Sequence, residues 1–319
     1  MSPRRGVALL AALWLVVAIA TVALQFSIEA RERRTVGVLT SERGIQRAAA
    51  LGALAFTQAR LEQALRVAPT GTNVQRLRSS DPWMDVDSVY SGPVLVDSMQ
   101  VDVVARDLGE RLNINRTNET QLQTFFSFLL GDYSKATQLA QTIMDWRDVD
   151  SMPRPSGAER DAYIKAGMLA LPTNTPFREI EELQHVMGMT PDIYATVAPY
   201  LTTHGTAAVN LNTAPVAVLR ALPGMTDATL NRILQLRSQG QKISNIAEVF
   251  PAMRVGGRRL PGQVGSPAAI AQLNAQVSTN TTQVELTIIA RVGPQAPPTR
   301  LTAIVARQGS SATVRTKLW

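Results

Sequence analysis

The sequence predicts an α+β protein in which a long N-terminal helix packs on an antiparallel sheet that carries a large inserted all-α domain. Three observations favour this fold. No proline occurs between Pro3 and Pro69, and the apolar pattern in that segment is helical. Apolar and polar residues alternate in residues 84–104 and again near the C-terminus, as in strands. Residues from Asn118 to about 200 have helical spacing, so a helical block lies between strands of one sheet.

The first element is a helix over about residues 7–66. Its first part, Val7–Leu24, is an 18-residue apolar run in which Thr21 is the only polar member. Such a helix spans ~27 Å, about one hydrocarbon core. Two arginines precede the run and favour a cytoplasmic N-terminus. A cleaved secretory signal fits poorly because no clear small-x-small site follows, which leaves a simple signal anchor as the plainest alternative.

The second part of this helix has one apolar stripe. Leu51, Leu54, Leu61 and Leu65 recur at helical spacing, with Gln58 filling the missing step. This stripe predicts that the helix leaves the membrane and packs on a soluble domain. An ordinary anchor does not need that continuity.

The segments that follow complete the predicted sheet and its insertion. Pro69–Pro82 is expected to be a loop, and residues 84–104 are expected to form two antiparallel strands around a break at Ser91–Pro93. In the helical block, residues 178–188 form a short helix that ends at Gly188.

The C-terminal third begins with two helices over Pro215–Leu236, separated by Pro223–Gly224. A Gly/Pro/Arg-rich stretch follows at residues 254–267. Residues 284–292 and 301–308 are β-rich and predict a hairpin with a seven-to-eight-residue loop.

Composition excludes several function classes. The 319 residues contain no cysteine, so a disulfide framework, a thiolate metal site and a catalytic cysteine are absent. The net charge of +7 is modest and aromatic residues make up 5%, so nucleic-acid binding is not demanded. His185 and His204 have no obvious shared partner, and no nucleophile elbow, P-loop or zinc spacing occurs. We therefore expect no enzyme; a membrane-anchored hydrolase would need a convergent polar pocket that the sequence does not indicate.

One short sequence occurs twice. Leu112-Asn113-Ile114-Asn115-Arg116-Thr117 resembles Val209-Asn210-Leu211-Asn212-Thr213-Ala214, and both copies precede a helix that a neighbouring Thr or Asn can cap. Either a helical module is duplicated, or two unrelated capping turns use the same common residues.

The densest acidic segment runs from Asp145 to Asp161. Hard cations such as Ca²⁺ bind six to eight oxygens from carboxylates and loop carbonyls. Asp148 and Asp150 are spaced to face one centre in a loop, and Glu159 and Asp161 return two carboxylates after prolines and a glycine. The spacing is not that of an EF-hand. The alternative is a solvated acidic loop in which Arg147, Arg154 and Arg160 are counter-charges.

Leu222-Pro223-Gly224 is similar to a helix-hairpin-helix turn, which grips DNA phosphates through backbone amides. Asp227 would oppose a phosphate there, and the usual second glycine is missing. Structural packing is the favoured role.

The N-terminal pattern resembles type IV pilin-like proteins: a short basic leader ends at Gly6, and an apolar helix continues into an amphipathic one. This resemblance implies that a prepilin peptidase cuts after Gly6, so that Val7 becomes a methylated N-terminus. The fifth mature residue, usually glutamate, is here Ala11. That gap is typical of type II secretion protein K, the large minor pseudopilin at the filament tip.

The acidic segment is also similar to the protein K signature, in which D-W-x-D-x-D precedes G-A-E. The resemblance implies a structural Ca²⁺ site in the inserted domain. Its best ligand candidates are Asp148, Asp150 and Glu159, followed by Asp145 and Asp161. Trp146 is interpreted as a core anchor.

The resemblance covers essentially the whole chain and implies its domain organisation. The expected parts are a leader (1–6), a transmembrane segment (7–26), the first part of a pilin-like domain (27–115), an inserted helical domain (116–204), and a helical hairpin with C-terminal strands that complete the pilin-like domain (205–319).

The implied function is that of a minor pseudopilin of the type II secretion system. It would sit in the bacterial inner membrane as a single-pass protein, with a cytoplasmic N-terminus and a periplasmic globular part. Its implied partners are other minor pseudopilins in a tip complex, the major pseudopilin, prepilin peptidase and the inner-membrane secretion platform, and not nucleic acid. The alternative is a membrane-anchored DNA-uptake protein that uses the Leu222-Pro223-Gly224 turn.

Overall fold

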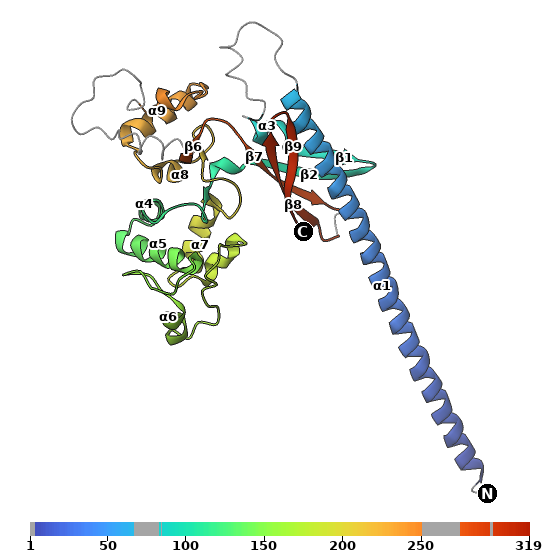
Figure 1. Ribbon diagram of the computed structural model, residues 1–319. Helices are drawn as coiled ribbons and strands as arrows, with labels where there is room; N and C mark the ends of the chain where they lie inside the picture. The colour runs from blue at the N-terminus through green and yellow to red at the C-terminus, as the bar shows by residue number, and fades with distance from the viewer. Residues whose placement is uncertain (1–3, 67–82, 84, 251–274, 294–295) are drawn as a thin grey trace, which may run out of the picture.

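A 63-residue helix dominates the shape of the molecule (Figure 1). The computed structural model describes residues 4–66, 83, 85–250, 275–293 and 296–319, with the backbone alone for residues 4–11 and 35. Helix α1 (Arg4–Arg66) runs without interruption, and its N-terminal half projects away from all other elements (Figure 1). It is the one helix among the described residues that is long and apolar enough to cross a membrane.

The C-terminal half of α1 crosses a five-stranded antiparallel sheet with the strand order β1-β2-β7-β8-β9. The strands are β1 (Gly92–Val96), β2 (Met99–Asp107), β7 (Gln283–Ala290), β8 (Thr299–Gln308) and β9 (Ser311–Leu318). β2 and β7 are neighbours, with Val103 opposite Ile288, although about 180 residues separate them in sequence. Everything between them is an insertion in the sheet, as the order of predicted elements indicated.

The face of α1 that packs on the sheet is made largely of small residues. Ala50, Ala53 and Thr57 are fully buried together with Leu61. The predicted leucine stripe is therefore only partly correct, because Leu51 lies at the edge of the contact and is 40% exposed. Short side chains bring the helix close to the strands, and a Cβ at Gly52 would lie 2.8 Å from a methyl of Val96.

The first hairpin is displaced from its predicted position. A short helix, α3 (Val86–Val89), replaces the expected first strand, and Gly92 begins β1 rather than breaking a strand. The turn between β1 and β2 includes Asp97, a residue with a left-handed φ of 52°. Strand β9 was not predicted at all, because Ala312 is its one fully buried residue and the strand shows no clear alternation.

The inserted segment folds around a hydrophobic core separate from that of the sheet. Its elements are η1 (Leu108–Glu110), β3 (Leu112–Asn113), α4 (Glu119–Leu130), α5 (Tyr133–Arg147), α6 (Arg160–Lys165), η2 (Ile180–His185), α7 (Pro191–Val197), η3 (Ala198–Tyr200), β4 (Leu201–Thr202), β5 (Val209–Asn210), α8 (Val216–Arg220), α9 (Asp227–Ser238), η4 (Ile246–Glu248) and β6 (Val277–Ser278). The helix predicted before Gly188 is the 3₁₀-helix η2.

Helices α8 and α9 belong to this second core. We expected an insertion at 116–204 and a hairpin that completes the pilin-like domain. Instead, Val218, Leu219 and Ile233 are buried in the same cluster as the apolar residues of α4 and α5. The helical unit therefore extends from about Leu112 to Val277, because these short helices find their apolar partners on α4 and not on the sheet. The expected loop at Pro69–Pro82 and the stretch 254–267 lie outside the described residues.

The repeated sequence forms the same structure twice. β3 pairs in parallel with β4, and β5 pairs in parallel with β6. In the first copy the amide of Asn115 accepts from Phe177 N and donates to Phe177 O; in the second, Asn212 accepts from Ile243 N and donates to Ile243 O. Unrelated capping turns would not share these long-range partners, so the structure favours a duplicated module.

In each copy a half-buried arginine donates a hydrogen bond to the last residue of the repeated sequence. Arg147 at the end of α5 donates to the carbonyl of Thr117, the last residue of the first repeated sequence. Arg237 near the end of α9 donates to the carbonyl of Ala214, the last residue of the second, at 2.7 Å. Burial lowers the pKa of both guanidinium groups to about 10. The first copy differs in one respect: acidic residues follow its arginine.

Candidate cation site in the inserted helical unit

Helix α5 carries the first acidic residue of the candidate site into the core. Asp132 caps its N-terminus by accepting from Lys135 N at 3.0 Å. Leu139, Ile143 and Trp146 face the core at helical spacing. Asp145 lies on the same buried side and is 0% exposed. The helix ends at Asp148, and the prolines that follow hold the next residues in an irregular loop.

Three carboxylates converge beyond the end of α5. Oxygens of Asp148, Asp150 and Glu159 all lie within 4.8 Å of one another. Glu159 is 6% exposed, yet neither of its carboxylate oxygens has a hydrogen-bond partner among the described residues. Oδ1 of Asp148 is also buried without a partner. Burial, together with the charges of Asp145 and Asp148, raises the pKa of Glu159.

This arrangement fits a hard divalent cation. A buried carboxylate without a hydrogen-bond partner is costly, and a cation that binds several oxygens removes that cost. Ca²⁺ would be held by Asp148, Asp150 and Glu159, and it would join the end of α5 to the start of α6. An entirely solvated acidic loop, the alternative expected from sequence, does not account for the burial of Glu159.

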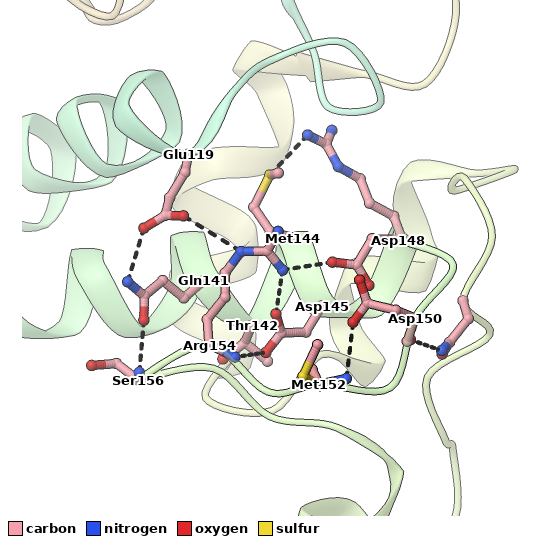
Figure 2. A network of polar contacts seen from close by, with 12 residues as sticks. Glu119, Gln141, Thr142, Met144, Asp145, Asp148, Asp150, Met152, Arg154 and Ser156 are labelled. Atoms are coloured by element: carbon pink, nitrogen blue, oxygen red, sulfur yellow. Dashed lines mark hydrogen bonds and ion pairs between the residues drawn. The ribbon is translucent and has the colours of Figure 1, made fainter.

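Arg154 lies beside Asp148 and Asp145 (Figure 2). Its Nη1 donates to Oδ2 of Asp148 at 2.6 Å and also to Oδ1 of Asp145. Its Nε lies 3.5 Å from Glu119 on α4. Burial lowers the pKa of Arg154, but the hydrogen bonds to Asp148 and Asp145 and their charges outweigh this and raise it above its usual range.

Both carboxylate oxygens of Asp145 accept hydrogen bonds from Arg154. Besides Arg154 Nη1, Asp145 accepts from the Arg154 backbone N–H at 3.1 Å. Gly157 lies so close that a Cβ there would be 1.9 Å from Oδ2 of Asp145. Asp145 therefore supports the loop, and it is not part of the three-carboxylate cluster.

A second loop is attached to the site. Asn174, with a left-handed φ of 50°, donates from its side chain to the carbonyl of Asp150 and from its backbone to the carbonyl of Trp146 at 3.1 Å. Trp146 is 2% exposed and stacks on Phe177 with 6.1 Å between ring centroids. The interpretation of Trp146 as a core anchor is confirmed.

The structure thus brings together three of the five predicted ligands. Asp161 is exposed on the first turn of α6 and lies outside the cluster. The side chains of Gly6, Val7 and Ala11 lie outside the described residues. Sequence reasoning missed Glu119 and Asn174, and it treated Arg154 as a local counter-charge only. No motif marks Asn174, although an Asn is among the residues that tolerate a left-handed turn.

The turn that is similar to a DNA-binding motif connects α8 and α9. Gly224 has a φ of 73°, as the tight turn requires. Arg220 and Asp227 form an ion pair of 2.9 Å across it, and Leu222 is buried in the helical core. This turn belongs to the second copy of the duplicated module. It corresponds in the first copy to the turn at Gly131 between α4 and α5, where Gly131 also has a left-handed φ, of 65°. Packing accounts for this turn, as favoured from sequence.

Part of the inserted unit is similar to known proteins. A family model described as type II secretion system protein K matches residues 105–206. The type II secretion system protein K of Dickeya chrysanthemi is 32% identical over 142 residues, and that of Klebsiella pneumoniae is 32% identical over 111 residues. The corresponding protein of Pectobacterium carotovorum subsp. carotovorum is 31% identical over 78 residues.

Over part of its length the chain is therefore similar to type II secretion system protein K. Its alignments with the curated protein K relatives span 24–39% of the relatives' length and 24–42% of this chain. A chain of the crystal structure of the GspK–GspI–GspJ complex from enterotoxigenic Escherichia coli covers much more of the fold. That match has a TM-score of 0.56 and 17% identity, and it covers 88% of this chain and 98% of that chain. The pilin-like fold with inserted helices is thereby confirmed, whereas nothing in these comparisons favours DNA uptake.

Proposed function

We propose that this protein is a minor pseudopilin of the type II secretion system and works in the tip complex that initiates or caps the periplasmic pseudopilus. The observation that carries this proposal is the combination of one apolar α1 with a protein K domain inserted in its sheet. A helix that anchors the chain before assembly can later pack among the helices of a filament. The role is one of assembly and not of catalysis.

Deleting the gene tests this function. Substrates of the secretion system should accumulate in the periplasm of the deletion strain, and the intact gene should restore their export. Retained and exported substrate are measured in the periplasmic and culture-medium fractions, with a cytoplasmic marker as the control for lysis. Unchanged export in the deletion strain would contradict the proposal.

The partners follow from the same role. One chain of a GspK–GspI–GspJ complex shares this fold, which supports other minor pseudopilins as neighbours. The major pseudopilin, prepilin peptidase and the inner-membrane secretion platform would also contact the chain. In this topology the N-terminus is cytoplasmic and the globular part is periplasmic. Co-purification of the full-length chain with tagged minor pseudopilins from detergent-solubilised membranes checks the first of these contacts.

We further propose that the leader is removed after Gly6 and that Ala11 fits the subunit for a terminal position. A carboxylate in hydrocarbon needs a partner. A subunit that lacks the carboxylate at this position needs no pairing group from a neighbouring subunit. Helix α1 places all of these residues in one continuous helical backbone. The breadth of the helical insertion would also hinder stacking from above.

Replacing Ala11 with Glu tests the terminal position. If the missing charge matters, the variant should be found within filaments, with further subunits above it, when its position is mapped by cross-linking. A variant that stays at the tip and supports normal export would show that Ala11 does not set the position.

The carboxylate cluster is proposed to hold a structural Ca²⁺ through Asp148, Asp150 and Glu159. The ion would neutralise the unpartnered oxygens of Glu159 and Asp148 and so stabilise the folded state. The full-length protein in detergent should melt at a higher temperature with millimolar Ca²⁺ than with chelator. No shift, or the same shift in Glu159→Gln, would remove the site.

A further inference from the structure

We propose that Arg154 is an internal counter-cation that competes with the divalent ion for Asp148 and thereby sets the affinity of the site. This inference rests on the cation site proposed above. It assigns to Arg154 a positioning role: the guanidinium holds the acidic loop together when the ion is absent and limits how tightly the ion binds when it is present.

The first support is that Asp148 both accepts from Arg154 and belongs to the three-carboxylate cluster. Its Oδ2 accepts from Arg154 Nη1 at 2.6 Å, whereas its Oδ1 is buried without a partner, and one oxygen of Asp148 lies within 4.8 Å of oxygens of Asp150 and Glu159. A carboxylate bonded to a guanidinium has less negative charge to offer a second cation. Asp148 can therefore serve the ion fully only if its bond to Arg154 weakens.

The second support is the reach of the guanidinium. Arg154 contacts Glu119 on α4, Asp145 on α5 and Asp148 at the end of α5. Figure 2 shows its planar head group among these carboxylates, with Gln141 linking Glu119 to the backbone of Ser156. Such a planar, multivalent donor does structurally what an ion does at a site with several oxygens.

The third support is the charge balance around the cluster. Four carboxyl groups gather here, those of Asp145, Asp148, Asp150 and Glu159, and Arg154 is the one cation that forms an ion pair with any of them among the described residues. Arg147 is next in sequence to Asp148, but its hydrogen bonds go to the Thr117 carbonyl and to the sulfur of Met144. Removing the charge of Arg154 leaves these carboxylates without an ion-pair partner among the described residues.

These observations predict that loss of Arg154 has opposite effects in the ion-free and the ion-bound protein. Without an ion, loss of Arg154 leaves Asp145 buried and unpaired, so the protein should be less stable. With an ion, the same loss frees Oδ2 of Asp148, so the ion should bind more tightly. A residue that merely supports the fold would lower stability equally in both states.

Arg154→Gln separates these outcomes, and Arg160→Gln is the matched control. Arg160 is adjacent to Glu159 but exposed, and the substitution removes the same formal charge. The probe is Ca²⁺ alone, titrated into the chelator-treated full-length protein in detergent, with calorimetry for Kd and thermal melting for Tm. We expect Arg154→Gln to lower the Tm in chelator, to increase the Ca²⁺-dependent rise in Tm and to lower Kd several-fold, whereas Arg160→Gln changes each of these little.

Each result has one meaning. If the Kd for Ca²⁺ is unchanged or higher in Arg154→Gln, or if it falls equally in both variants, the inference is overturned while the Ca²⁺ site stands. Binding by Arg154→Gln but not by the natural protein supports the competition and removes the proposed site from the natural protein. Binding by neither overturns both.

A second variant covers the case in which Arg154→Gln fails to fold. Arg154→Lys keeps the charge but cannot bridge Glu119, Asp145 and Asp148 at once. Its Kd for Ca²⁺ should lie below that of the natural protein. An equal or higher Kd would contradict the inference.

Discussion

Gly157 is the residue at which the acidic loop closes over Asp145. A methyl group there would lie 1.9 Å from Oδ2 of Asp145, so Gly157→Ala must push the loop or the carboxylate aside. We expect a loss of about 1 to 3 kcal/mol in the free energy of unfolding and a smaller Ca²⁺-dependent rise in Tm. Gly293→Ala is the control, because nothing lies within 4 Å of a Cβ at that position. Equal melting of the two variants would contradict this geometry.

Asp107, at the end of β2, joins the sheet to the helical unit. Its carboxylate is 1% exposed and accepts from Asn210 Nδ2 and from Thr213 Oγ1, each at 2.7 Å. Burial raises its pKa, although these hydrogen bonds act in the opposite direction. The pKa of Asp107 is therefore higher in the folded than in the unfolded protein. Its contribution to the free energy of unfolding is fully present below the pKa of the unfolded state, and it is lost as the pH rises through the pKa of the folded state.

The consequence is a pH-dependent difference between two proteins. Asp107→Asn keeps the shape of the side chain but does not titrate. The stability of the natural protein relative to this variant should be greater at pH 4 than at pH 7, measured by denaturant unfolding at each pH. A difference that is constant, or that grows with pH, would show that Asp107 is not penalised by burial.

At the scale of elements, the two half-buried arginines Arg147 and Arg237 occupy equivalent places in the duplicated module. Arg237 on α9 donates at 2.8 Å to the carbonyl of Leu211 and at 2.7 Å to that of Ala214. Arg237→Met leaves both carbonyls without this donor and should cost about 2 to 3 kcal/mol of unfolding free energy. Arg232→Met on the exposed side of the same helix should be nearly neutral. Similar losses in both variants would show that the hydrogen bonds of Arg237 to these two carbonyls do not stabilise the module.

The contact between α1 and the sheet gives a second test at this scale. Leu61 is fully buried in the sheet core, whereas Leu51 on the same helix is 40% exposed. Leu61→Ala should cost about 2 to 5 kcal/mol of unfolding free energy, and Leu51→Ala much less. Thermal melting of the two variants side by side checks this, and equal losses would place both leucines in the buried stripe, as the sequence pattern alone suggested.

The elements also show what the sequence could predict and why. Helix α1, the α8–α9 turn and the β7–β8 hairpin have strong local signals: periodicity, a Pro-Gly break and two β-rich runs. Strand β9 and η2 have weak patterns, since their conformations depend on neighbours in the tertiary structure. For the site, the spacing of Asp148, Asp150 and Glu159 indicated convergence. The engagement of Asp145 by Arg154, and the contact from Asn174, depend on folding that no local pattern encodes.

At the scale of the whole molecule, two separate cores are connected through the end of β2. The sheet core includes the buried face of α1, and the helical core carries the carboxylate cluster at a distance from that helix (Figure 1). A pilin-like subunit with such an insertion can anchor in the membrane through α1 and present a broad surface to neighbouring subunits. This arrangement is consistent with the assembly role proposed above.

The mature N-terminus of the membrane-bound protein tests the pseudopilin assignment most directly. Intact-mass and N-terminal peptide mass spectrometry, on protein isolated from cells with an active secretion system, measures it. We expect a chain that begins at N-methylated Val7, because prepilin peptidase would cut after Gly6 and methylate the new end. An intact leader, or a cut further along α1, would contradict the assignment of this chain to the pilin-like assembly pathway.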